Sequence, residues 1–138
     1  MKGIHMLLDQ LTPEEKKSFW NIANLLASSD GSAREEESIL EQYNEEMGTG
    51  FEYPAAAEID LKKELDTLRG SSAKDRKIVY FELFGVAYAD TAFDDREKQI
   101  LDKVCLALSL SDDVRKTLED SVKTIFDTYR KLGDIFNS

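Results

Sequence analysis

Apolar residues recur along most of this chain three and four positions apart, the spacing typical of amphipathic α-helices. The first helical stretch begins at residues 12–15, a capping-box sequence, and ends at Asp30-Gly31. Further stretches cover about residues 33–47, 55–69, 72–89, 94–108 and 111–136, with Gly133 expected to break the last one. A strand-like alternation is confined to residues 3–8. The pattern predicts an all-α fold, a compact bundle of six to seven helices.

The stretch at residues 72–89 is apolar on most of its sides, so we expect it to be the buried central helix. We expect four residues to lie in the core: Phe84, Val86, Ile100 and Val104. The clear loop at residues 48–54 has two glycines, a proline and two aromatic residues. Its aromatic rings are expected to attach the loop to the core.

Part of the helical pattern occurs twice, about 60 residues apart. Residues 26–40 and 86–101 each pass from an apolar helix end to an Asp, a short turn, an acidic helix start and an Ile-Leu pair. Such a repeat predicts two stacked supersecondary units. We therefore expect the helix pairs at about residues 13–47 and 73–108 to superimpose, within a single domain of residues 1–138.

The composition excludes several classes of protein. The chain has 28 acidic and 18 basic residues and a net charge of −10, which argues against nucleic acid as a partner. No stretch reaches the length of a membrane span, and the N-terminal apolar run is too short for a signal peptide. The single cysteine, Cys105, lies in an apolar run and is expected to be a buried hydrophobic residue. We expect a cytoplasmic protein without direct membrane insertion.

The two copies of the repeat place carboxylates at equivalent helix–helix corners. The candidates are Asp30 with Glu36 or Glu37 at the first corner, and Asp90 with Glu97 at the second, where Asp94 and Asp95 could add oxygens. Hard cations such as Ca²⁺ or Mg²⁺ prefer oxygen ligands, so one interpretation is a divalent metal site. The other needs no metal: Asp94 and Glu97 form a capping box, and Asp30 and Asp90 bond the backbone of their own turns.

Other catalytic chemistry has little support in this sequence. His5 is the sole histidine and has no Cys or Asp partner in its vicinity along the chain. Phosphate-loop, dinucleotide and serine-hydrolase motifs are lacking. We therefore expect a protein that is not an enzyme. The alternative is a metal-dependent hydrolase that uses Asp90 and Glu97.

The second acidic corner, residues 89–97 followed by Ile100-Leu101, resembles the tellurite-resistance TerB family and its wider superfamily. Residues 29–37 are a looser second match, and Thr91 stands where the family pattern has glycine. The resemblance implies about seven helices and a non-catalytic part of a larger assembly in bacterial stress and chemical-damage responses. It implies metal binding at Asp30, Glu36 or Glu37, Asp90 and Glu97. It implies a protein partner but does not identify it, and it leaves the oligomeric state open.

Overall fold

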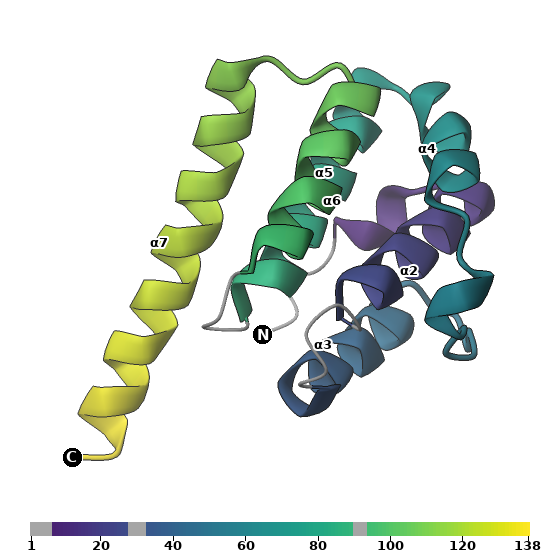
Figure 1. Ribbon diagram of the computed structural model, residues 1–138. Coiled ribbons are helices and arrows are strands. Elements are labelled where there is room, and N and C mark those ends of the chain that lie inside the picture. The colour runs from purple at the N-terminus through teal and green to yellow at the C-terminus, as the bar shows by residue number, and fades with distance from the viewer. Residues whose placement is uncertain (1–6, 28–32, 90–93) are drawn as a thin grey trace.

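A computed structural model describes residues 7–27, 33–89 and 94–138, with the backbone alone for residues 33–38 and Ala56. Every regular element in these ranges is helical (Figure 1). The α-helices are α2 (Pro13–Ala27), α3 (Ala33–Glu46), α4 (Leu61–Arg69), α5 (Ala73–Ala89), α6 (Asp95–Ala107) and α7 (Asp112–Phe136). Two 3₁₀ turns, η1 (Leu8–Gln10) and η2 (Ala56–Glu58), complete the elements. The predicted all-α class is confirmed.

Helix α5 is the centre of the bundle, as its nearly continuous apolar sequence predicts. It packs against α2, α3, α6 and α7, so few of its faces are left to solvent. The four expected core residues are buried: Phe84, Val86, Ile100 and Val104. Cys105 is also buried, and burial raises the pKa of its thiol, as expected for a packing residue rather than a reactive one.

The loop after α3 is attached to the core by its aromatic residues, as expected. The Trp20 indole is fully buried, and its N–H donates a hydrogen bond of 2.9 Å to the backbone carbonyl of Glu52. The rings of Phe51 and Tyr53 lie 6.0 and 5.3 Å from the Trp20 ring, centroid to centroid. These contacts hold the loop against α2.

Two predicted helix boundaries are wrong. The helix expected over residues 55–69 is divided into η2 and α4, because the Asp60 side chain accepts the backbone N–H of Lys63 at 3.2 Å and starts a new helix. Gly133 does not interrupt α7, which continues to Phe136. A glycine inside a helix costs only about 1 kcal/mol, and helix-forming neighbours can offset that. Of the expected strand, Leu8 lies in η1 and residues 3–6 lie outside the described residues.

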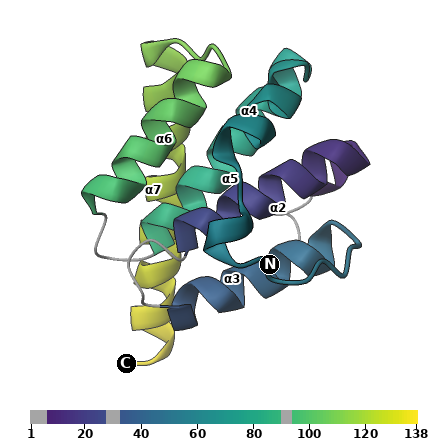
Figure 2. The same ribbon diagram turned by 45° about the vertical axis from the view of Figure 1, so that its right-hand side comes forward.

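Helix α7 lies along α5 and then continues beyond the ends of α5 and α6 (Figures 1 and 2). Each of the two helix pairs that carry the repeat, α2 with α3 and α5 with α6, is in contact. Residues 28–32 and 90–93, which join the helices of each pair, lie outside the described residues. Superposition of the two pairs therefore stays a prediction.

Candidate functional site

The start of α6 carries the best-defined part of the predicted acidic corner. The Asp94 carboxylate accepts the backbone N–H of Glu97 at 2.8 Å, and the Glu97 carboxylate accepts the backbone N–H of Asp94 at 3.4 Å. These two bonds are a reciprocal capping box, as the sequence predicts. Glu97 has no exposed surface, so its carboxylate lies on the core side of the helix.

The other predicted ligands are not placed with these two. Asp30 and Asp90 lie outside the described residues, and for Glu36 and Glu37 only the backbone within α3 is described. Among the side chains that the structure does describe, no group of three His, Cys, Asp or Glu residues could hold a metal ion. The convergence of Asp90 with Glu97 therefore stays a prediction.

A second capping box at the start of α2 shows how this fold accommodates a buried glutamate. The Glu15 carboxylate accepts the backbone N–H of Thr12 at 2.8 Å, and the Thr12 hydroxyl accepts the N–H of Glu15 at 3.2 Å. Burial alone would raise the pKa of Glu15, but hydrogen bonds, those with Ser71 and Thr12 among them, hold it below its usual value. A buried carboxylate is thus kept as an anion by hydrogen bonds.

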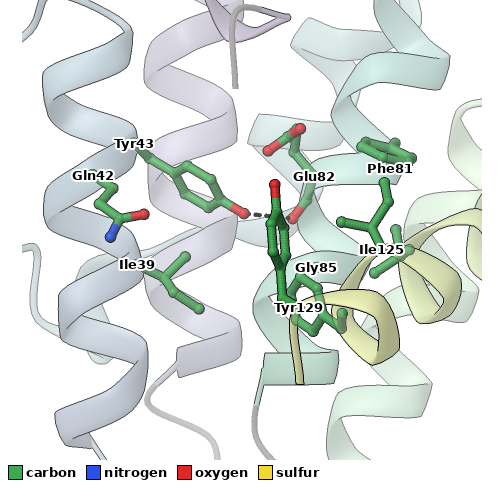
Figure 3. A pocket seen from close by; sticks show the side chains of 10 residues that line it. Ile39, Gln42, Tyr43, Phe81, Glu82, Gly85, Ile125 and Tyr129 are labelled. Atoms are coloured by element: carbon green, nitrogen blue, oxygen red, sulfur yellow. Dashed lines mark hydrogen bonds between the residues drawn. The ribbon is translucent and has the colours of Figure 1, made fainter. Parts of the chain in front are cut away.

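A feature that the sequence analysis missed is an apolar groove between α3, α5 and α7 (Figure 3). Its volume is about 160 Å³. Residues from all three helices line it: Ile39, Gln42, Tyr43, Phe81, Glu82, Gly85, Val122, Ile125, Phe126 and Tyr129. Gly85 forms part of its floor, where an added Cβ would lie 3.4 Å from the Tyr43 hydroxyl oxygen. A glycine at this position lets α3 approach α5 closely.

The groove also contains a buried acid, Glu82. Burial, and in second place the charge of Glu46, raise the pKa of Glu82 to about 8. Burial and the charge of Asp9 raise the pKa of Glu46 to about 7. The Tyr43 hydroxyl donates a hydrogen bond of 3.3 Å to the backbone carbonyl of Glu82. A lone glutamate inside the apolar sequence of residues 78–88 was the available signal for this acid.

Contacts between aromatic rings and cations join α5 to α7. Each of three rings spaced four residues apart on α5 has a cation from α7 above it: Tyr80 with Arg115, Phe84 with Lys123, and Tyr88 with Arg130. The centroid distances are 5.7, 5.9 and 5.8 Å, within the range of favourable cation–π interactions. The Arg115 guanidinium is also paired with Asp102 at 2.7 Å and Glu119 at 3.0 Å. These contacts attach α7 to the bundle from Arg115 to Arg130.

Comparison with known families decides the identity of the fold. The model of the TerB family, described as tellurite resistance protein TerB, matches residues 6–120, which include α2 to α6 and the start of α7. The chain belongs to the TerB family. Among curated proteins and among solved structures, none matches this chain significantly.

The family assignment agrees with the all-helical bundle and covers both acidic corners. The match ends at residue 120, within α7, so the C-terminal half of that helix lies outside the matched residues. None of the helices in the described part of the chain is long and apolar enough to cross a membrane.

Proposed function

We propose that this TerB-family chain is a non-catalytic module of a bacterial response to tellurite or related chemical stress. We further propose that it binds a divalent cation, Ca²⁺ or Mg²⁺, at its acidic helix corners. The observation on which both parts depend is the position of Glu97. Its carboxylate is fully buried at the start of α6, and Asp94 and Asp90 precede it along the chain.

The burial of Glu97 favours a non-catalytic role. A general acid or base must come within hydrogen-bonding distance of its substrate, and a carboxylate with no exposed surface does not meet a substrate from solution. Asp94 and Glu97 already have a structural role, because each accepts a backbone N–H at the helix start. A hydrolase that uses Glu97 would have to break this capping box.

The same burial favours a cation. A buried carboxylate is stable as an anion only where hydrogen bonds or positive charge surround it. The capping box and the positive end of the α6 dipole supply part of that stabilisation. A divalent cation bound by oxygens of Asp90, Asp94 and Glu97 would supply more. Asp30 with Glu36 or Glu37 would form the equivalent site at the first corner.

Calorimetric titration and thermal melting with Ca²⁺, Mg²⁺, Mn²⁺ and Zn²⁺ test the proposal. We expect one of these ions to raise the melting temperature of the parent protein, because a ligand stabilises the state that it binds. Asp90→Asn should abolish that rise while leaving the cation-free melting temperature nearly unchanged. Glu97→Gln keeps the capping geometry, since Gln also serves this position, but should weaken the response to the ion.

The matched control is Asp113→Asn, which removes the same charge from an exposed position in the first turn of α7, outside both acidic corners. It should respond to the ion as the parent does. A parent protein whose melting temperature is unchanged by all four ions would contradict the cation site. In that case the capping box would be the whole role of Asp94 and Glu97.

A further inference from the structure

A second groove lies between α4 and α6, away from the acidic corners and from the groove between α3, α5 and α7 (Figure 2). We call it the α4–α6 groove, and its volume is about 270 Å³. Leu61 and Leu65 of α4 and Leu106 and Ala107 of α6 form its apolar walls. The Leu106 side chain is 83% exposed although it lies within α6, so the bundle leaves a large apolar residue uncovered at this groove.

The α4–α6 groove is basic although the net charge of the chain is −10. Lys62 and Arg69 of α4 and Lys103 of α6 line it, and none of the described residues in its lining is acidic. Within the described part of the chain, the ammonium groups of Lys62 and Lys103 make no ion pair. Arg69 is paired with Asp66 at 3.2 Å, but both side chains are more than half exposed. Such exposed pairs are weak, so the Arg69 guanidinium is available to a carboxylate of a partner.

Two further acidic side chains close to these residues along the chain are turned to other helices. Asp102 is paired with Arg115 of α7 at 2.7 Å. The Glu64 carboxylate accepts hydrogen bonds of 2.9 and 2.7 Å from the side chains of Ser18 and Asn21 on α2. These carboxylates therefore do not neutralise the cations of the α4–α6 groove.

We propose that the α4–α6 groove binds an acidic amphipathic helix of a partner protein. Apolar side chains spaced three or four residues apart on that helix would enter the groove. Carboxylates on either side of them would pair with Lys62 and Arg69 on one wall and with Lys103 on the other. The groove follows the nine residues of α4, about 13 Å, which is between two and three turns of a partner helix. The inference rests on the non-catalytic role proposed above, because a module of that kind acts through its partners.

Charge favours a partner helix over an anionic membrane as the occupant. The three cations of the groove contribute +3 to the net charge of −10, so the rest of the chain carries −13. A membrane surface is broad and would also face much of that negative charge. A helix seated in the groove would face mainly the cations, because charges beyond a Debye length of about 8 Å are screened. The apolar walls exclude nucleic acid in the same way, since binding to its phosphates needs a basic surface.

Fluorescence anisotropy of a labelled peptide, with a metal chelator present, tests the proposal. The probe is a synthetic peptide of about 15 residues, long enough to populate a helix, with Leu at positions i, i+3 and i+7 and Glu beside them. We expect it to bind the parent protein, and to bind more weakly as salt is added, because exposed ion pairs are screened. A peptide with Lys in place of every Glu is the control and should not bind.

Two substitutions in the α4–α6 groove, each with a matched control, locate the binding site. Lys103→Glu reverses a charge and Leu106→Asn removes an apolar contact, so each should weaken peptide binding at least about tenfold. Lys131→Glu and Ile135→Asn make the same changes on α7, outside the groove, and should bind the peptide as the parent does. All four positions are exposed, so circular dichroism should show a folded protein in each case.

A parent protein that does not bind the acidic peptide would overturn the inference, as would equal binding by the parent, Lys103→Glu and Leu106→Asn. Binding of the parent to mixed phosphatidylcholine–phosphatidylserine vesicles but not to the peptide would assign the groove to a membrane. Self-association that Leu106→Asn abolishes, without peptide binding, would assign it to a second copy. Either result would overturn the inference.

The proposed function can fail separately from this inference. The cation site is measured by thermal melting, and none of the groove residues belongs to an acidic corner. A hydrolase activity that Asp90→Asn abolishes would refute the non-catalytic role, and it would leave the anisotropy of the peptide unchanged.

Discussion

At the scale of single residues, Glu82 is the side chain whose charge state matters most for stability. Its pKa is raised from 4.5 to about 8, because burial disfavours the charged form. Between these two values the unfolded chain releases the proton and the folded chain keeps it. Stability should therefore fall as pH rises from about 4.5 to 8, and the full loss is present above pH 8.

Glu82→Gln should remove the part of the pH dependence that comes from Glu82, because Gln has nearly the same shape and never ionises. The part that comes from Glu46, whose pKa is raised to about 7, should remain. We expect the parent and the variant to unfold at similar urea concentrations at pH 4.5, and the variant to be more stable at pH 8. Each unit of pKa shift corresponds to about 1.4 kcal/mol, so the difference at pH 8 should be a few kcal/mol. Glu58→Gln, at an exposed position of η2, is the control and should leave the pH profile unchanged. Parallel profiles for the parent and Glu82→Gln would contradict the assignment.

The residues that could be identified from the sequence interact with near neighbours along the chain, whereas those that were missed depend on residues far away along it. Asp94 and Glu97 could be identified because a capping box is local, with both partners within four residues. Glu82 was missed although it stands alone in an apolar sequence, because its place in the groove depends on α3 and α7, which are distant along the chain. The convergence of Asp90 with Glu97 remains a prediction, because Asp90 lies outside the described residues.

At the scale of elements, the end of α6 is strained. Ser109 has a φ of 56°, a left-handed conformation that side-chain-bearing residues rarely adopt and that glycine tolerates. Ser109→Gly relieves this strain, but glycine also gives the unfolded chain more conformational freedom, which offsets part of the gain. The free energy of unfolding should therefore rise by about 0.5–1 kcal/mol. Urea unfolding at a single pH measures the change.

The end of α3 offers the reverse substitution as a control. Gly48 has a φ of 67°, and no described atom lies within 4 Å of where its Cβ would be. Gly48→Ala should therefore destabilise the protein through backbone strain alone, by about 1 kcal/mol. If both substitutions changed stability in the same direction, the left-handed conformation would not be the cause.

The elements were predicted well where local chemistry sets their ends. Ser72, Asp94 and Ser111 each accept a backbone N–H three residues later, and the three helices start directly after these caps, at the starts of the predicted ranges. The break between η2 and α4 was missed although Asp60 is a similar cap. The apolar spacing of residues 55–69 continues through that break, so hydrophobic periodicity alone does not reveal it.

At the scale of the whole molecule, the all-α class and the central position of α5 follow from the distribution of apolar residues. A helix that is apolar on most sides must be surrounded, and four helices surround α5. The groove does not follow from that distribution, because its lining comes from three helices and its floor depends on Gly85. The helical spacing of apolar residues predicted α7, but it could not show which half of the apolar face of that helix the bundle covers.

This uneven cover of α7 predicts uneven local stability. The helix is fixed to α5 by Tyr80, Phe84 and Tyr88, and beyond Tyr129 it has mostly exposed side chains. Helical hydrogen bonds without tertiary packing open easily, so in dilute solution the amides of residues 130–136 should exchange hydrogen much faster than those of residues 118–126. Hydrogen-exchange mass spectrometry of peptides from the two halves measures this difference. Equal protection along the whole of α7 in dilute solution would show that its C-terminal half is stable without a partner.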